Sequence, residues 1–296
     1  MKISGIFEQT AHTFSFEFFP PKDEISAVDF GVNVGRLMKL SPSFVSVTYG
    51  AGGSNRERTF ALVNYLQNKT GMNVMAHYTC VGASKTEIIA DISYLKSINV
   101  NNLMLLRGDP PKGTTDFVPH NDGFAHASEL IEAVCSEFRN TFTVGAACYP
   151  EKHPEAKTQE EDIARLKEKT DAGADFLITQ FFFDNDLYFN FINEVRNAGI
   201  RCRIIPGIIP LTSYSQIDRF VKLSGAKIPS VLADKIAASK DNPKRLVQTG
   251  IDYTIEQCKN LILGGAPGVH FYTLNKSGAT VEIYETVRKY VVNETV

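Results

Sequence analysis

Glu17 stands where a carboxylate could act as a proton donor inside the protein. It belongs to the segment 14–19, FSFEFF, in which phenylalanines alternate with Ser15 and Glu17. Alternate side chains of a β-strand point to opposite faces, so the phenylalanines predict a face packed on helices and Glu17 points to the other side. A buried carboxylate costs free energy unless it is paired or neutral. A carboxylate at this position indicates a role in catalysis. The alternative is a structural salt bridge to a neighbouring strand.

Polar residues also lie at the ends of other apolar segments that are typical of strands. They are Thr48, Tyr49, His77, Thr79, Arg107, Asp109, Tyr149, Gln180, Tyr272 and Asn275. Each one alone is more typical of a satisfied core group or a structural pair. Their common position at strand ends predicts a single site. Its two carboxylates, Glu17 and Asp109, could divide acid and charge-stabilising roles.

Eight strands are needed to position these residues. They are predicted at 14–19, 44–49, 73–80, 102–108, 142–149, 176–183, 202–209 and 269–274. Helical spacing is found between them, at 28–40, 57–70, 85–99, 126–139, 160–173 and 185–199, within 212–263, and at 279–291.

Alternating strands and helices imply a parallel sheet. Eight units of about 37 residues in a chain of 296 predict a closed barrel, whose catalytic groups gather at the carboxyl ends of the strands. We therefore predict the α/β class, with one (β/α)8 TIM barrel domain over residues 1–296. Residues 1–13 are predicted to be an N-terminal extension.

The competing architecture is an open doubly wound sheet, which would carry a Gly-rich turn after its first strand. Here the first strand instead runs into Phe19-Pro20-Pro21-Lys22. The Gly-rich segment 50–55 follows the second strand and has Asn55 in place of the last glycine. A dinucleotide would therefore have to be held without a Rossmann motif.

The composition excludes several classes of function. Lys+Arg at 31 against Asp+Glu at 33 gives a net charge of −2, so no broad basic face is expected for nucleic acid. No apolar run approaches the ~18 residues of a membrane span, and the N-terminal segment 1–14 lacks the apolar stretch expected of a signal peptide. Five cysteines without a C-x-x-C pair predict reduced thiols in a cytoplasmic protein. The spacing of histidines and cysteines predicts no metal site.

Six segments together resemble the signatures of the methylenetetrahydrofolate reductase family. They are FEFFPP (16–21), FVSVTYG (44–50), LRGD (106–109), YPEKHPEA (149–156), TQFFFD (179–184) and IPGI (205–208). The resemblance runs in order from about residue 14 to residue 276. It is to the short bacterial form, because nothing after the predicted barrel could serve as a regulatory domain.

The resemblance implies a barrel that holds FAD at the carboxyl ends of its strands. It implies reduction of 5,10-methylenetetrahydrofolate to 5-methyltetrahydrofolate with NAD(P)H in a ping-pong cycle. The product would supply one-carbon units for methionine synthesis. Relatives are often oligomers, so the resemblance is compatible with a homo-oligomer.

The family motifs also imply roles for individual residues. Glu17 would be the general acid for ring opening, and Asp109 would favour positive charge on the folate. The positions that match FAD contacts are Thr48, Tyr49, Ala51, His77, Arg107, Gly108, Asp109, Ala127, Tyr149, His153, Ala156, Asp162 and Lys169. The positions that match folate or nicotinamide contacts are Gln180, Gln216, Phe220 and Lys276.

Three features depart from the family pattern. Lys276 stands where the family usually has arginine, and lysine lacks the planar guanidinium fork. Arg165 and Glu168 differ from the bacterial form in the helix that carries Asp162 and Lys169. The loop 110–127 has a different length, which affects the match at Ala127.

Two other functions compete with the reductase. A cofactor-independent barrel lyase or transferase would need a strand lysine or a metal cluster, and no predicted strand core contains lysine. A non-catalytic barrel used as a binding scaffold gives no reason for Glu17 and Asp109 at the mouth.

Overall fold

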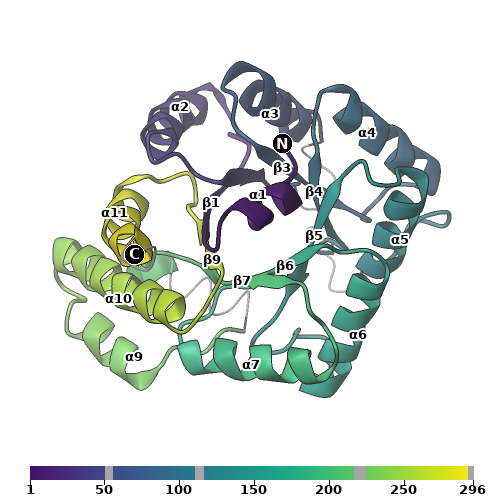
Figure 1. The fold of residues 1–296 in the computed structure, drawn as a ribbon. Coiled ribbons are helices and arrows are strands. Elements are labelled where there is room, and N and C mark those ends of the chain that lie inside the picture. The colour runs from purple at the N-terminus through teal and green to yellow at the C-terminus, as the bar shows by residue number, and fades with distance from the viewer. Residues whose placement is uncertain (51–55, 111–116, 217–224, 293–296) are drawn as a thin grey trace.

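The computed structural model describes residues 1–50, 56–110, 117–216 and 225–292. Helices surround a ring of strands, as Figure 1 shows. The strands are β1 (Thr13–Phe18), β2 (Phe44–Val47), β3 (Val74–Thr79), β4 (Asn102–Leu106), β5 (Thr143–Cys148), β6 (Phe176–Thr179), β7 (Arg203–Ile205), β8 (Gly207–Ile208) and β9 (Gly268–Tyr272). The described helices are α1 (Ile3–Gln9), α2 (Glu24–Met38), α3 (Arg56–Lys69), α4 (Lys85–Ser97), α5 (Ala127–Glu137), α6 (Gln159–Asp171), α7 (Asn185–Asn197), α9 (Ser230–Ala237), α10 (Pro243–Leu263) and α11 (Gly278–Val292).

The strands form one parallel sheet in the order β7-β6-β5-β4-β3-β2-β1-β9-β8. The two ends of this order are consecutive in the chain, because only Pro206 separates β7 from β8. Proline has no backbone N–H to donate, so the seventh predicted strand is split there. β7 pairs with β6, and β8 pairs with β9. The sheet therefore closes on itself, and the predicted (β/α)8 barrel is confirmed.

The sixth predicted strand, 176–183, is too long. The ladder continues one residue past Thr179, because Gln180 N donates to Cys148 O at 2.8 Å. It then stops, since the side-chain Oε1 of Gln180 accepts the N–H of Phe181 at 3.0 Å. A side chain that bonds its neighbouring backbone competes with the ladder, and the following phenylalanines form a loop.

The two faces of β1 separate as the alternation predicts. The ring of Phe14 packs edge-on against Tyr284 of α11 at 5.2 Å between centroids, and Phe18 packs against Phe30 of α2 at 5.7 Å. Ser15 and Glu17 face the lumen instead, where Ser15 meets His270 of β9. The outer face of β1 therefore builds the core, and its inner face builds the site.

Helix α1 closes the amino-terminal end of the barrel, where it crosses the ring in Figure 1. Ile3 is fully buried, and its N–H donates to Asn102 Oδ1 at 2.7 Å. Phe7 packs on Phe176 with 5.2 Å between centroids. This end of the lumen is apolar, with a buried cluster of Ile3, Phe44, Met75, Met104, Phe176, Ile178 and Ile205.

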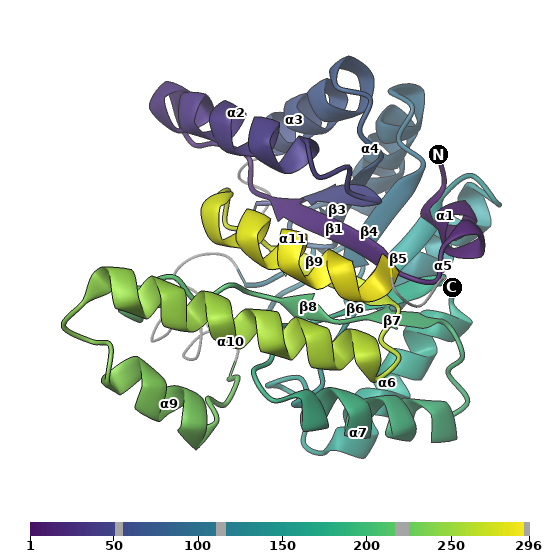
Figure 2. The ribbon, with the colours of Figure 1, turned by 60° about the vertical axis from the view of Figure 1, so that its left-hand side comes forward.

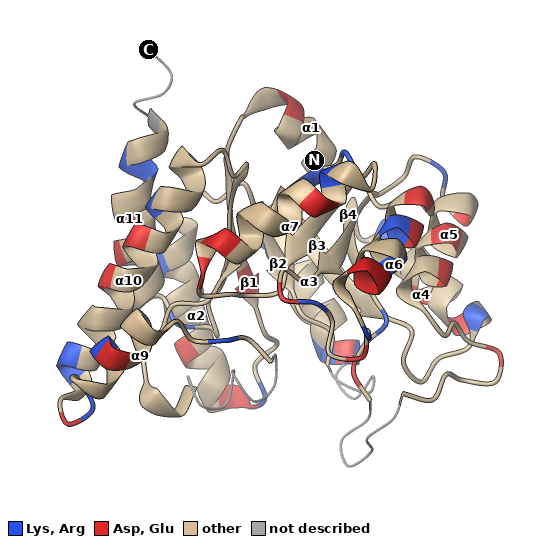
Figure 3. Cartoon of the chain, turned by 90° about the horizontal axis from the view of Figure 1, so that it is seen from below, with Lys and Arg blue, Asp and Glu red and all other residues tan. Residues whose placement is uncertain are grey.

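The surface carries charges of both signs, in agreement with the net charge of −2. Basic and acidic residues are interspersed along α6 in Figure 3, where Lys167 and Asp171 form an ion pair at 2.7 Å. Helices α10 and α11 lie side by side on the outside of the barrel (Figure 2). Within the described residues, no helix combines the length and apolarity that crossing a membrane requires. All five cysteines are free thiols.

Candidate active site at the carboxyl ends of the strands

Glu17 lies between two histidines in the barrel lumen. Its side-chain Oε2 is 3.6 Å from His77 Nε2 of β3 and 3.9 Å from His270 Nε2 of β9. Glu17 is 6% exposed and His77 is 7% exposed. The backbone carbonyl of Glu17 accepts a 2.6 Å hydrogen bond from Thr273 Oγ1, which holds this end of β1 against β9. Glu17 and His77 are thus brought together, as predicted, by strands far apart in sequence.

Sequence reasoning missed the part played by His270. Its Nδ1 is 2.7 Å from Ser15 Oγ, and its Nε2 is 3.4 Å from Ser46 Oγ. The ring stacks on Phe44 with 6.1 Å between centroids. These contacts fix the ring, so that Nε2 faces Glu17. The signal was available, because His270 lies two residues before Tyr272 and so on the same face of β9.

His77 is held in its neutral form. Burial lowers the pKa of this imidazole to about 4, and the nearby Glu17 carboxylate only partly opposes the shift. Among the described residues, His77 Nε2 has no hydrogen-bond partner. The 3.6 Å contact with Glu17 is therefore not an ion pair at neutral pH, and His77 retains a polar atom for a ligand.

Arg107 and Asp109 follow β4, and Arg107 is firmly held. Its guanidinium donates to both carboxylate oxygens of Glu155 at 2.6 Å, and it lies over the ring of Phe117 at 4.9 Å. The Glu155 hydrogen bonds raise the pKa of Arg107. Burial raises the pKa of Tyr149, and the negative charge of the exposed Asp109 adds to that rise. Glu155 is a site residue that the sequence reasoning did not single out.

The loop after β5 joins four predicted cofactor contacts into one network. The ring of Tyr149 meets His153 edge-on at 4.7 Å, and His153 N donates to Asp162 Oδ2 at 3.0 Å. Lys169 Nζ donates to Ala147 O at 3.0 Å. Burial lowers the pKa of Lys169, and the nearby Asp162 carboxylate opposes only part of this shift. Lys169 thus reaches β5 from α6, whereas Asp162 reaches the loop after β5.

Tyr49, after β2, lies against a buried tyrosine and an ion pair. Its ring is 5.0 Å from that of Tyr78, whose hydroxyl donates to Asp91 Oδ2 at 2.8 Å. Arg56, at the start of α3, also bonds Asp91. Burial raises the pKa of Tyr49 to about 12. The phenol is therefore a neutral hydrogen-bonding group, positioned by α3 and α4.

Gly108 adopts a conformation that favours glycine, with φ of +90°. A Cβ there would lie 2.9 Å from both Thr79 Cβ and Val81 Cγ2, so the β4 end approaches β3 closely. Thr79 Oγ1 is buried and has no partner among the described residues. Thr79 Oγ1 and His77 Nε2 are thus two polar atoms without a partner in the described part of the chain, and Arg107 and Lys169 add two cations. Together these groups fit a cofactor with a polar ring and phosphates.

The other predicted contacts are less closely tied to Glu17. Gln216 Oε1 accepts from Thr212 Oγ1 at 2.6 Å, and Lys276 is exposed after β9. Ala127 is the buried first residue of α5. Ala156 N donates to His153 O at 3.0 Å. Ala51 and Phe220 lie outside the described residues. Thr48 N donates to Phe18 O at 2.9 Å, so it lies at the end of β2 beside β1.

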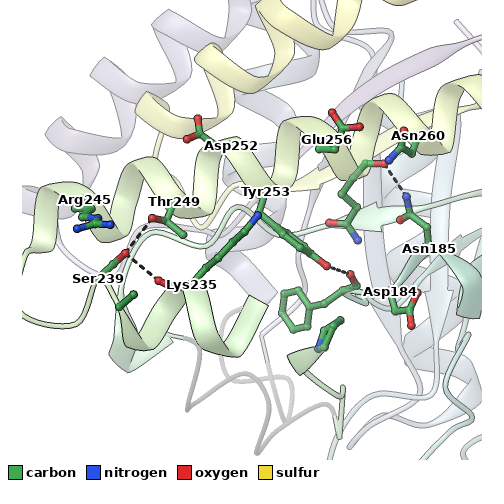
Figure 4. A pocket seen from close by; sticks show the side chains of 14 residues that line it. Asp184, Asn185, Lys235, Ser239, Arg245, Thr249, Asp252, Tyr253, Glu256 and Asn260 are labelled. Atoms are coloured by element: carbon green, nitrogen blue, oxygen red, sulfur yellow. Dashed lines mark hydrogen bonds between the residues drawn. The ribbon is translucent and has the colours of Figure 1, made fainter. Parts of the chain in front are cut away.

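A separate cavity of about 580 Å³ lies between α9, α10 and the start of α7 (Figure 4). None of the predicted site residues lines it. Three of its hydroxyls already have partners, because Ser239 Oγ is 3.1 Å from Thr249 Oγ1 and Tyr253 donates to Phe183 O. The candidate site at the barrel mouth is therefore separate from this cavity. Over the part of the chain described, no group of three or more His, Cys, Asp or Glu residues could hold a metal ion.

The fold and the site define a (β/α)8 barrel with a buried carboxylate–histidine cluster and nearby cations at its carboxyl mouth. The family model described as methylenetetrahydrofolate reductase matches residues 2–288. The chain is 34% identical to the 5,10-methylenetetrahydrofolate reductase of Escherichia coli over 92% of this chain and 90% of that protein. It is 35% identical to methylenetetrahydrofolate reductase (NADH) 1 of Arabidopsis thaliana over 95% of this chain and 49% of that protein.

This chain belongs to the methylenetetrahydrofolate reductase family, a family of oxidoreductases. It spans about half the length of the plant relatives that it matches. A solved protein of Clostridium thermocellum, described as binding two copies of 5-methyl-5,6,7,8-tetrahydrofolic acid, shares the fold. It has a TM-score of 0.66, 16% identity and 98% coverage of both chains.

Proposed function

We propose that this chain reduces 5,10-methylenetetrahydrofolate to 5-methyltetrahydrofolate with NAD(P)H, using FAD in a ping-pong cycle. The observation that carries the proposal is the buried Glu17 between His77 and His270 at the barrel mouth. The family match favours this reaction over a cofactor-independent lyase or transferase. The product would supply one-carbon units for methionine synthesis. Free thiols are typical of cytoplasmic proteins, so the five free cysteines support a cytoplasmic location.

FAD, when bound, would supply a group that takes a hydride from NAD(P)H and returns it to the folate. Arg107, Lys169, His77 and Thr79 are the residues that would hold it, because they present cations and unpaired polar atoms from β3 to α6. Tyr49 and Tyr149 would contribute aromatic surface. Gly108 allows the backbone of the β4 end to lie close to β3.

Glu17 would donate the proton that opens the five-membered ring of the folate to an iminium ion. His270, fixed by Ser15 and Ser46, would help to position the carboxyl group, with neutral His77 3.6 Å away on its other side. Asp109 would favour the positive charge on the iminium ion. Gln180, Gln216, Phe220 and Lys276 would bind folate or nicotinamide.

The reaction is tested with purified protein under anaerobic conditions. We expect a flavin absorption spectrum that NADH or NADPH bleaches and that methylenetetrahydrofolate restores, with 5-methyltetrahydrofolate as the product. A colourless protein that takes up no added FAD would contradict the cofactor. A flavin bleached by NAD(P)H but unaffected by methylenetetrahydrofolate would contradict the substrate.

A further inference from the structure

Asp91 is a charged residue buried where the barrel packs on its helices. It lies on α4, and only 2% of it is exposed. Its Oδ2 accepts a 2.8 Å hydrogen bond from the hydroxyl of Tyr78 on β3, and its Oδ1 accepts one from the guanidinium of Arg56 at the start of α3. Figure 1 shows α3 and α4 as neighbours in the ring of helices. Asp91 thus joins two helices to one strand through polar contacts.

These polar contacts lie among apolar side chains. Ile88 and Ile92 of the same helix are fully buried on either side of Asp91. Burial raises the pKa of Asp91, so its charge costs free energy there, and its two hydrogen bonds oppose the shift. A well-packed apolar pair is often as stable as a buried ionic contact, or more stable. Stability alone therefore does not account for Asp91 and Tyr78.

Tyr49 is the residue that this network reaches at the barrel mouth. The centroid of its ring is 5.0 Å from that of Tyr78 and 6.4 Å from that of Phe60 on α3. Thr59 Oγ1 donates to Thr48 O at 3.2 Å, which ties the end of β2 to the same helix. Tyr49 itself is only half-buried. Its position thus depends on Tyr78, while part of its surface stays open to a ligand.

We propose that Asp91 is a positioning residue for the FAD site. With Arg56 it holds the hydroxyl of Tyr78, and the ring of Tyr78 holds that of Tyr49. The inference rests on the proposed function, in which Tyr49 offers aromatic surface to FAD. A ring that is already held loses less conformational freedom when a ligand binds. The network therefore acts on the affinity for FAD, and it acts through Tyr49.

Fluorescence titration of the apoprotein with FAD tests this role. Tyr78→Phe keeps the ring but releases it from Asp91, and it should weaken FAD binding about tenfold. In a Tyr49→Ala background the same substitution should change the affinity less than about twofold, because the residue through which it acts is gone. Tyr284→Phe is the control and should leave FAD binding unchanged. Its buried hydroxyl also donates a 2.8 Å hydrogen bond, but to Leu40 O, which precedes β2 at the opposite end of the barrel.

A double variant separates positioning from stability. Tyr78→Phe with Asp91→Leu removes the buried charge together with its partner, so the melting temperature should stay close to that of the wild type. FAD binding should nevertheless be about tenfold weaker. Nuclear magnetic resonance of ring-labelled tyrosines reports on the apoprotein, with the Tyr49 signal assigned by its loss in Tyr49→Ala. In the double variant this signal should move toward the position of an unfolded tyrosine, and in Tyr284→Phe it should not.

The proposed function and the positioning role fail in different ways. A wild type that takes up no FAD would overturn the cofactor, and the positioning role with it. Normal FAD binding by the wild type and by Tyr78→Phe would overturn only the positioning role. An equally large loss of affinity in the Tyr49→Ala background, or a Tyr49 signal that does not move in the double variant, would do the same.

Discussion

The Nε2 atom of His77 lies 3.6 Å from the Oε2 atom of Glu17, and both side chains are buried. Burial keeps the imidazole neutral, so the contact is a polar one without a compensating cation. A buried carboxyl group beside two imidazoles is suited to hold and deliver a proton. This relationship leads to the first two predictions.

Glu17→Gln should abolish turnover of methylenetetrahydrofolate while leaving the cofactor site intact. Loss of a general acid costs typically about 10²–10⁴-fold in rate. Stopped-flow absorbance should show that NAD(P)H still bleaches the flavin, while the folate restores its colour slowly or not at all. Glu57→Gln on the surface of α3 is the control. Equal loss in both half-reactions would show that Glu17 is not the acid specific to the folate.

His77 should make the protein less stable as the pH falls. The imidazole of the unfolded chain protonates near pH 6.5, but that of folded His77 protonates only near pH 4. Between these values the unfolded state binds the extra proton, so the free energy of unfolding falls by up to about 1.4 kcal/mol per pH unit. His77→Gln should flatten this part of the curve in urea titrations, and His12→Gln should not. If His77→Gln left the slope of the free energy of unfolding against pH unchanged, this would contradict a neutral imidazole in folded His77.

Gly108→Ala should cost more stability than Gly199→Ala. Both positions have positive φ, +90° and +85°, so both substitutions strain the backbone by roughly 1–3 kcal/mol. A Cβ at Gly199 meets nothing, whereas one at Gly108 lies 2.9 Å from Thr79 Cβ and Val81 Cγ2. Thermal unfolding should therefore show the larger decrease for Gly108→Ala. Equal decreases in melting temperature would mean that β4 and β3 accommodate the added Cβ without a cost in free energy.

Arg107→Gln should weaken FAD binding about 10–100-fold, because hydrogen bonds to charged groups contribute roughly 1.5–3 kcal/mol. Fluorescence titration of apoprotein with FAD measures this. Glu155→Gln should bind FAD at least as tightly as the wild type, since it removes a carboxylate that now engages Arg107 at 2.6 Å. Arg165→Gln, in an exposed pair with Glu168, is the control. Unchanged affinity in Arg107→Gln would remove this residue from the cofactor site.

The eightfold barrel could be predicted because strand and helix periodicities are local properties of the sequence. The alternation in 14–19 was enough to direct the phenylalanines to the helices and Glu17 to the lumen. The end of β6 could not be predicted, because the side chain of Gln180, rather than composition, terminates the ladder. The break in the seventh strand depends on Pro206 at the closure point.

The sequence by itself determined the barrel, the family and the strand ends at which polar residues gather. The tertiary structure decided which of them meet: Glu17 with His77 and His270, and Arg107 with Glu155. These partners come from strands and loops that are distant in sequence, so their distances depend on sheet register and closure. Burial is also a property of the whole fold, and it is burial that makes His77 neutral.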